Sequence, residues 1–337
     1  MWRQVFCTVY DHANMPHKSL WEVSPYYASK TACGARGKPC QIIWRTPAFY
    51  LSNHNQMLGA AIIHPAQRAV IPLMPEPIVH RDGTDNNDCE RNATKRFVGK
   101  LRQDHPHLKF ISTEDSLSAN APHIATLQDH DLRSILGVKE GDHAYVFQQG
   151  KAAEQAGRVT YYERHERAAG LVHRFRFVND MPLNASQATV RVHVIEYWEI
   201  GDEKVQHFSW VTDIRVSKRN VYTLMRGGRA RWKIENETFN TLKNQGYHFE
   251  HNYGHGEQHL SVVFATIMML AFLVDQTQQF CCALCRAVWA KLGSKRLLWE
   301  RLRALFYSYS LESVHELWAA LWYGYERHRP LLITDTS

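Results

Sequence analysis

A short segment late in the chain, residues 231–243, carries side chains that suit chemistry on a phosphate backbone. Each step of four residues turns a helix by about 40°, so side chains spaced by four form one slowly drifting stripe. Here the stripe consists of Arg231, Glu235, Phe239 and Lys243. Two cations flank one carboxylate, an arrangement that suits a site holding a metal ion against phosphate. The alternative is an Arg–Glu pair on a solvated helix, worth only about 0.2–0.5 kcal/mol.

A second acid, Asp115, follows a short predicted strand at residues 108–111. Open α/β sheets place their ligands beyond the carboxyl ends of strands, which makes this a candidate site residue. Its neighbour Glu114 would point to the opposite face of the strand, so only one of the two acids can reach a common site. The alternative for Asp115 is a loop residue that caps the next helix.

These motifs have a recognisable counterpart. The stretch Glu-Asp-Ser-Leu-Ser-Ala-Asn-Ala-Pro-His-Ile at 114–124, the Arg-Trp-Lys-Ile-Glu at 231–235 and the His-rich segment 247–256 resemble bacterial insertion-sequence DDE transposases. The similarity is to the cut-and-paste subgroup with a Tyr/Arg/Glu/Lys signature. It spans about residues 54–325 and is most specific at 57–77, 88–124 and 231–273. Ser116 stands where the subgroup has Gly, and the histidines of 247–256 are expected to order the loop after the catalytic helix.

The resemblance implies an RNase H-like catalytic core with a β-rich insertion and a C-terminal helical region. Three carboxylates of such an enzyme hold two divalent ions, Mg²⁺ by preference and Mn²⁺ as an alternative, for cutting and joining DNA. Asp115 would be the second catalytic acid and metal ligand, and Glu235 the third, with Glu237 as the alternative acid. Arg231 and Lys243 would contact DNA phosphates near the cut.

Two positions depart from the subgroup's signature. Its Lys normally lies seven residues after the Glu, where this chain has Leu242, and Lys243 is turned by about 100° from that position. Its Tyr, three residues before the Arg, is replaced by Gly228. Arg231 and Glu235 match well.

The first carboxylate departs as well. The subgroup has Asp-Gly-Thr-x-Tyr on its first strand, and the matching stretch here is residues 22–29, with Glu22 at the Asp position as catalytic and metal-binding candidate. The extra methylene of Glu moves the carboxylate by about 1.5 Å, whereas a metal site tolerates about 0.5 Å. Asp11 is a fallback that no motif supports.

Trp210 and the cysteines each allow two interpretations, one functional and one structural. In relatives a Trp at the place of Trp210 stacks on a base displaced from the duplex, an interaction worth about 1–3 kcal/mol, but a core Trp on a strand fits the sequence equally well. Zinc ligation is one interpretation of the cysteines, namely Cys281, Cys282 and Cys285 together with Cys33 and Cys40. Neither group has the spacing of a zinc finger. Buried thiols are the preferred interpretation.

Composition limits the class of protein. A formal charge of +7 and a pI of about 9.0 favour a polyanionic partner such as double-stranded DNA, here transposon ends and target. Seven cysteines without a secretory leader indicate a reducing cytoplasm, and the resemblance implies a bacterial protein associated with the nucleoid. The longest apolar run, residues 260–274, is shorter than the roughly 20 residues that cross a bilayer, so we expect a buried helix and no membrane partner.

The order of predicted elements divides the chain into five parts. Residues 1–53 form an irregular segment that includes the first catalytic strand, and 54–142 the first part of the core. A β-rich insertion at 143–215 precedes the catalytic helix and second part of the core at 216–275, and helices follow at 276–337. The chain starts close to the first catalytic strand, so we expect an N-terminally truncated or degenerate relative.

Two functions from different classes follow. The first is a transposase that cleaves and transfers strands at insertion-sequence ends and forms a homodimer on the DNA. The second is a catalytically inactive remnant that only binds DNA, and a structure-specific nuclease on the same core is a weaker third. The sequence feature that distinguishes the first two functions is the first carboxylate, which only the active transposase needs.

Overall fold

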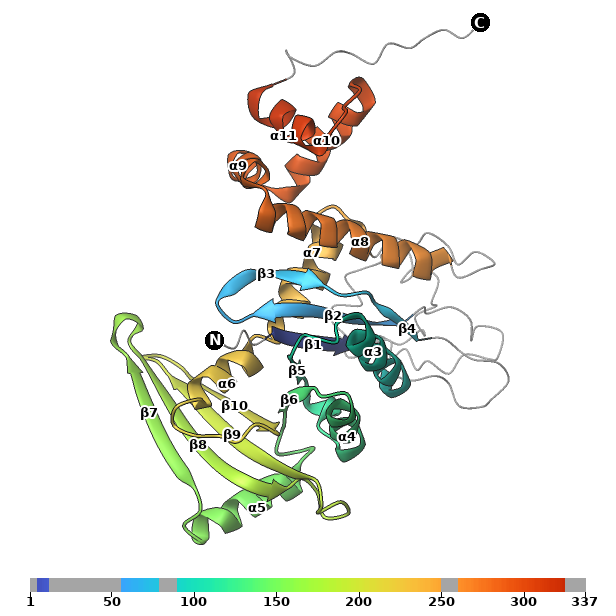
Figure 1. Cartoon of the computed structure of the whole chain (residues 1–337). Helices are drawn as coiled ribbons and strands as arrows, with labels where there is room; N and C mark the ends of the chain where they lie inside the picture. The colour runs from blue at the N-terminus through green and yellow to red at the C-terminus, as the bar shows by residue number, and fades with distance from the viewer. Residues whose placement is uncertain (1–4, 12–55, 79–89, 250–259, 325–337) are drawn as a thin grey trace, which may run out of the picture.

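The computed structural model describes residues 5–11, 56–78, 90–249 and 260–324, with the backbone alone at 5–11, 56, 90 and 91. The chain forms a mixed α/β structure around one ten-stranded mixed sheet (Figure 1). The strand order is β3-β2-β1-β5-β6-β10-β9-β8-β7, with β4 paired to β2. The strands are β1 Val5–Asp11, β2 Gln56–His64, β3 Gln67–Pro72, β4 Glu76–Ile78, β5 Phe110–Glu114, β6 Arg133–Gly137, β7 Thr160–Glu166, β8 Leu171–Pro182, β9 Arg191–Ile200 and β10 Val205–Thr212.

Strand directions divide the sheet into a parallel centre and antiparallel flanks. Strand β1 runs parallel to β5, and β5 runs parallel to β6. The remaining pairs, from β1–β2 and β2–β3 on one side to β6–β10 and the strands beyond it on the other, are antiparallel. The β-rich region expected at 143–215 therefore continues the same sheet, because β10 pairs directly with β6.

Helices lie on both faces of this sheet. They are α3 Glu90–Asp104, η3 Ser116–Ser118, α4 Ala121–Asp129, α5 Ala144–Gln155, η4 Arg167–Ala169, α6 Val221–Arg229, η5 Ile234–Phe239, α7 Asn240–Asn244, α8 Leu260–Cys281, α9 Ala283–Leu292, α10 Lys295–Ser308 and α11 Val314–Tyr323. Element η5 is a stretch of π-helix that continues into α7.

The buried strand β5 shows how the two faces are covered, because its side chains alternate between them. Phe110 packs with residues of α3 and α4, such as Phe97. Ile111, one residue on, packs instead in the cluster that contains Ile234 and Phe239 of η5. Helices α3 and α4 therefore cover one face of the central strands, and α6 and η5 cover the other.

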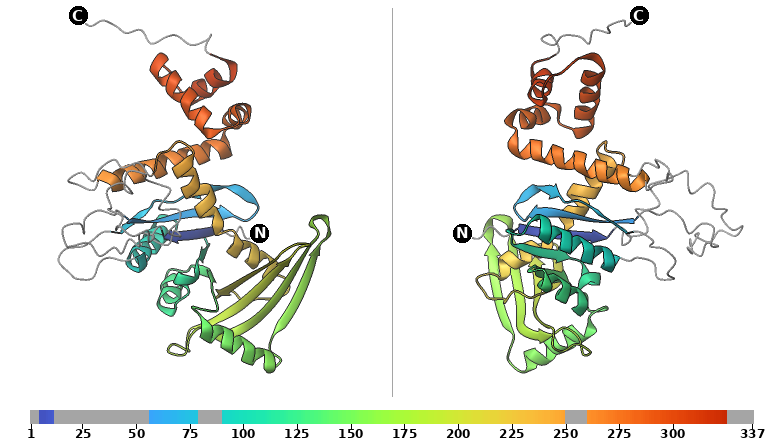
Figure 2. Two further views of the ribbon diagram at one scale, coloured as in Figure 1. Left: turned by 180° about the vertical axis from the view of Figure 1, so that it is seen from behind. Right: turned by 45° about the vertical axis from the view of Figure 1, so that its right-hand side comes forward.

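Element η5 lies across β1, β2 and β3, as the view from behind shows (Figure 2, left). The fully buried ring of Phe239 lies directly on Gly59 of β2, where an added Cβ would be only 2.4 Å from the Phe239 Cζ atom. At the other end of η5, Lys233 Nζ donates to the carbonyl of His64 at the end of β2, at 2.6 Å, and to that of Gln67 at the start of β3. The helix is thus attached to the sheet at both ends.

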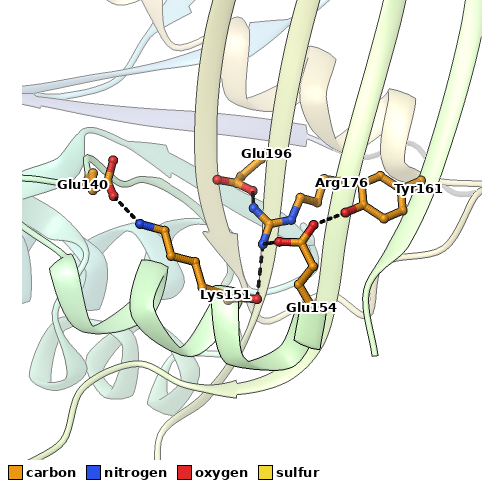
Figure 3. A network of polar contacts seen from close by, with 7 residues as sticks. Glu140, Lys151, Glu154, Tyr161, Arg176 and Glu196 are labelled. Atoms are coloured by element: carbon orange, nitrogen blue, oxygen red, sulfur yellow. Dashed lines mark hydrogen bonds and ion pairs between the residues drawn. The ribbon is translucent and has the colours of Figure 1, made fainter. Parts of the chain in front are cut away.

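A network of charged side chains attaches α5 to the outer strands (Figure 3). Arg176 of β8 lies 2.6 Å from Glu196 of β9, and its other terminal nitrogen contacts Glu154 at 3.0 Å and the Gly150 carbonyl at 3.2 Å. Arg176 and Glu196 are nearly buried and Glu154 is partly exposed. The network joins a helix to two strands and has the character of a structural anchor.

The C-terminal helices α9, α10 and α11 pack around a core of their own, apart from the sheet (Figure 1). Lys295, at the start of α10, joins this core to the rest of the molecule: its ammonium lies 4.8 Å from the ring centre of Trp289 and 5.3 Å from that of Phe272 in α8. Burial among these rings lowers the pKa of Lys295 to about 8. Burial also raises the pKa of the neighbouring Asp275, which accepts a hydrogen bond from Tyr247.

The apolar run near residue 260 differs from its expectation as a buried helix. It extends to the 22-residue helix α8, whose length and composition are sufficient to cross a membrane. A single such helix is weak evidence for a membrane protein, and only 17% of its 18-residue apolar window is buried. The sequence pattern is apolar on every side of the helix, which is why it favoured burial; in the structure only one side of α8 packs on the sheet.

We predict that Lys295→Met removes a pH-dependent part of the stability. The Lys295 pKa is lowered in the folded chain from an ordinary 10.5 to about 8. Between these values the unfolded chain holds a proton that the folded chain has released, so this lysine makes the wild type more stable as pH rises. From pH 8 to pH 10 the wild type should gain roughly 2 kcal/mol relative to the variant in urea unfolding.

Arg296→Met is the matched control, because Arg296 is an exposed neighbour whose one ion pair among the described residues is with Glu300 on the same helix. Its stability should follow the wild-type pH dependence. Equal pH dependence of the Lys295→Met variant and the wild type would contradict the burial of a charged amine here.

Candidate functional site

The two acids at the end of β5 have different environments. Glu114 is buried: Ser112 Oγ donates to its Oε1 at 2.5 Å, and His123 Nε2 of α4 lies 2.9 Å from its Oε2. Burial alone would raise the pKa of Glu114, but the charge of His123 and the hydrogen bonds outweigh it and lower the pKa. Glu114 is therefore committed to an ion pair on the α3–α4 face.

Asp115 is partly exposed, and its backbone remains extended. One carboxylate oxygen accepts a hydrogen bond from the Leu117 amide at 3.0 Å and so caps the short helix η3. This is the capping role left open by the sequence, and it uses only one oxygen. Strand alternation places Asp115 with Ile111 and Thr113, on the face that η5 covers.

The backbone register also sets Asp115 level with η5. Gly59, which supports Phe239, pairs with Tyr10 of β1. Tyr10 is two residues beyond Thr8, whose partner in β5 is Thr113, and Asp115 is two residues beyond Thr113. Neighbouring strands lie about 4.8 Å apart, so Gly59 and Asp115 are roughly 10 Å apart across the sheet. Asp115 and Phe239, the last residue of η5, therefore lie on one side of the sheet and at one level.

Glu235 lies on η5 with its side chain 26% exposed. Its Oε1 accepts a hydrogen bond from Arg231 Nη1 at 2.7 Å, so the cation expected to hold DNA phosphate is paired with the acid itself. Glu237, the alternative acid, is bound by Arg68 of β3 at 2.9 Å. Each of the two acids thus has an Arg partner, one in the turn that precedes η5 and one on the sheet.

The π-helical winding of η5 changes the side-chain stripe expected from a regular α-helix. Phe239 is fully buried, whereas Glu235 is partly exposed, so these two residues do not share one surface. Leu242, at the position of the subgroup's Lys, is fully buried, and Lys243 is half-buried on α7. Single π-turns occur often at functional sites, but a sequence periodicity of 3.6 contains no signal for one.

The structure places Trp210 in the core, the second of its two interpretations. It is 6% exposed on β10 and stacks against Phe208, with ring centres 5.8 Å apart. Gly228 of α6 packs on its indole, where an added Cβ would be 2.6 Å from Nε1. A Tyr at position 228, as in the subgroup's signature, would not fit. Trp232, by contrast, is 55% exposed and lies 5.9 Å from the Arg231 guanidinium.

The cysteines of the described C-terminal region are free thiols. Burial raises the pKa of Cys285 to about 11, and the Cys285 amide donates to the sulfur of Cys282 at 3.4 Å. A raised pKa disfavours the thiolate that zinc requires. In the part of the chain that the structure describes, no three His, Cys, Asp or Glu side chains group as a metal site. Cys33 and Cys40 lie outside that part.

The sequence offers Glu22 and the fallback Asp11 for the first carboxylate. Glu22 lies outside the described residues. The fallback Asp11 ends β1, where its backbone pairs with Leu58.

Comparisons with known proteins add no identification: no protein-family model matches the chain, and neither does any curated protein. The site is therefore defined by its residues. Its candidate acids are Asp115 and Glu235, Arg231 is bound to Glu235, and Trp232 is exposed beside Arg231.

We predict that Gly228→Ala destabilises the protein although Ala is the better helix former. The helix preference would contribute about 1 kcal/mol in favour of Ala, whereas overpacking against a buried indole costs about 1–3 kcal/mol. Thermal or urea unfolding measures the sign. In a Trp210→Phe background, which removes the five-membered ring, the cost should decrease. Gly141→Ala is the control, because nothing lies within 4 Å of its added Cβ.

A second prediction separates the roles of the adjacent acids. Glu114→Gln leaves the nearly buried His123 without its counter-charge and should cost about 3 kcal/mol in urea unfolding at neutral pH. Asp115→Asn keeps a capping acceptor and should change stability by less than about 0.5 kcal/mol. The lowered Glu114 pKa means that the wild type loses its extra stability as pH falls below 4.5, and the Glu114→Gln variant should lack this loss. A larger cost for Asp115→Asn than for Glu114→Gln would give Asp115 a structural role.

Proposed function

We propose that the chain acts on double-stranded DNA as a DDE-type transposase, with metal-dependent strand cleavage and transfer at insertion-sequence ends. The observation that supports this proposal is that η5, the helix bearing Glu235, packs on the side of the sheet to which strand alternation assigns Asp115. The strand order supports the RNase H-like core that the sequence resemblance implies: β1, β2 and β3 are antiparallel, and β5 and β6 run parallel to β1.

The donor groups fit a hard divalent cation. Asp115 and Glu235 are both carboxylates, partly exposed, and each uses one oxygen in the Leu117 or Arg231 hydrogen bond. Among the described residues, no partner is recorded for the second oxygen of either group. Mg²⁺ or Mn²⁺ held there would activate the attacking hydroxyl and stabilise the leaving oxygen.

The chain's own residues have separate roles in this proposal. Glu235 holds Arg231 in place before DNA binds, and the guanidinium then turns toward a phosphate while the carboxylate turns toward the cation. Trp232, rather than the buried Trp210, is the aromatic that can reach a displaced base. Lys243 extends the cationic surface along α7, and the net charge of +7 favours association with DNA. A homodimer on the DNA, in the bacterial cytoplasm, completes the proposal.

The second candidate is a remnant that binds DNA without cutting it. The ion pair between Arg231 and Glu235 favours this candidate, because it occupies both groups on one helix. Glu22, the candidate for the first carboxylate, lies outside the described residues. Experiment therefore has to distinguish the active transposase from the inactive remnant.

A nicking assay on a duplex that carries the DNA flanking the reading frame tests the proposal. With Mg²⁺ or Mn²⁺ the wild type should nick the strand, and Glu235→Gln or Asp115→Asn should lower the rate by about 100-fold or more, a loss of several kcal/mol of transition-state stabilisation. Glu237→Gln is the matched control, since Glu237 binds Arg68, and should keep most of the activity. Calorimetric titration with Mn²⁺ should show weaker binding to the Asp115→Asn variant without reference to activity.

The outcomes separate the candidates. Salt-sensitive DNA binding without nicking in every variant would support the remnant. Equal nicking by the wild type and Glu235→Gln would remove Glu235 from the site.

A further inference from the structure

Helix α8 presents apolar side chains to solvent on the side that faces away from the sheet. Seven of its eight exposed positions follow a spacing of alternately three and four residues, and we call these seven the α8 seam: Leu260, Val263, Ile267, Leu270, Val274, Thr277 and Cys281. The central members are more than half exposed, with Ile267 at 54%, Leu270 at 58% and Val274 at 51%. A water-exposed helix face is normally polar, so this face has the composition of an interface.

The opposite side of α8 is already occupied. Met269, Phe272 and Gln276 are buried, and α8 packs on β3 and on the cluster that contains η5. The helix, drawn in orange in Figure 1, is therefore fixed to the protein by one side, and the seam lies on its exposed side.

The seam has the repeat of a two-stranded coiled coil, in which apolar residues at the first and fourth positions of a heptad meet the same positions of a second helix. Ile267 and Val274 take the first position and Leu270 the fourth, a combination that favours two strands. We propose that two copies of this chain pair through the α8 seam, and that they do so without DNA. This proposal does not depend on the proposed enzymatic function.

The area is sufficient for such a pair. A helix of 22 residues is about 33 Å long. Over that length a helix pair at an axial distance of 8–10 Å covers roughly 600 Å² on each copy, or about 1,200 Å² in total. That exceeds the approximately 1,000 Å² that distinguishes a specific interface from a weak contact.

The charges of α8 favour a second copy over other occupants. Within the helix Asp275 is the one charged residue, and it accepts a hydrogen bond from Tyr247. A nucleic-acid surface would need cations, and a helix lying on a membrane surface is normally rich in Lys and Arg on its polar face. An uncharged, self-complementary stripe matches another copy of itself.

The oligomeric state of the full chain tests the proposal. Sedimentation equilibrium without DNA should show a dimer, and Leu270→Glu should weaken it by at least 100-fold because two carboxylates would face each other in an apolar seam. Tyr307→Glu is the matched control, since Tyr307 is 84% exposed on α10 and lies off the seam, and this variant should remain dimeric. Circular dichroism confirms that each variant is folded.

Cross-linking gives a second measurement that keeps the seam residues largely intact. Leu270 lies close to the midpoint of α8, so Leu270→Cys in a Cys281→Ser background should form a disulfide-linked dimer whether the helices are parallel or antiparallel. The native Cys281 lies at the end of the seam and would cross-link to its mate only in a parallel pair. The Cys281→Ser variant alone is the control for other cysteines.

Three results would overturn the proposal. They are a monomeric wild type at all concentrations measured, a dimer that persists unchanged in Leu270→Glu without Leu270→Cys cross-linking, and a monomer that binds neutral phosphatidylcholine vesicles through the seam.

Discussion

The close approach of Phe239 to Gly59 is the constraint on which the candidate site depends. A side chain at position 59 would push η5 away from β2, and with it the helix segment that carries Glu235. The absence of a Cβ lets an aromatic ring lie directly on the strand, so the helix position is fixed by contact instead of by a flexible loop. The Lys233 bonds to the β2–β3 turn and the Arg68–Glu237 pair then fix the direction in which η5 runs.

Buried and half-buried charges are distributed so that the two faces of the central strands differ. On the α3–α4 face, Glu114 and His123 neutralise each other within the core. On the η5 face, the acids Asp115 and Glu235 keep contact with solvent. One residue of displacement along β5 therefore separates an acid that stabilises the fold from one that remains available for chemistry, because successive side chains of a strand point to opposite faces.

Much of the central fold could be predicted from periodicity. The strand predicted at 108–111 appears as β5, and the β-rich region predicted at 143–215 contains β7, β8, β9 and β10. The helix α5 was missed, because it lies in a region whose other segments alternate as strands do. The π-helical winding of η5 could not be predicted either. Phe239 of this π-helix packs against Gly59, 180 positions earlier, and the local residue spacing gives no signal for such a contact.

The candidate site divides in the same way. Strand alternation was enough to separate Asp115 from Glu114, since that rule depends only on adjacent residues. The core position of Trp210 was one of two equal interpretations, because an aromatic residue on a strand has the same sequence signal whether it packs on Gly228 or faces DNA. The i, i+4 spacing of Arg231 and Glu235 in the sequence indicated that the two side chains could pair. Only the structure shows that Arg231 Nη1 donates to Glu235 Oε1.

The two edge strands of the sheet, β3 and β7, are protected against edge-to-edge aggregation by different means. At one border β3 lies under α8 and η5, so its backbone is screened by helices. At the other border β7 carries Glu163, Arg164 and Glu166, which present charges to any approaching strand. Exposed strand borders are templates for aggregation, and charged side chains or covering helices suppress it. A fragment that ended before α8 would leave β3 without the cover of that helix. Helix α8 therefore also hinders edge-to-edge assembly of the molecule.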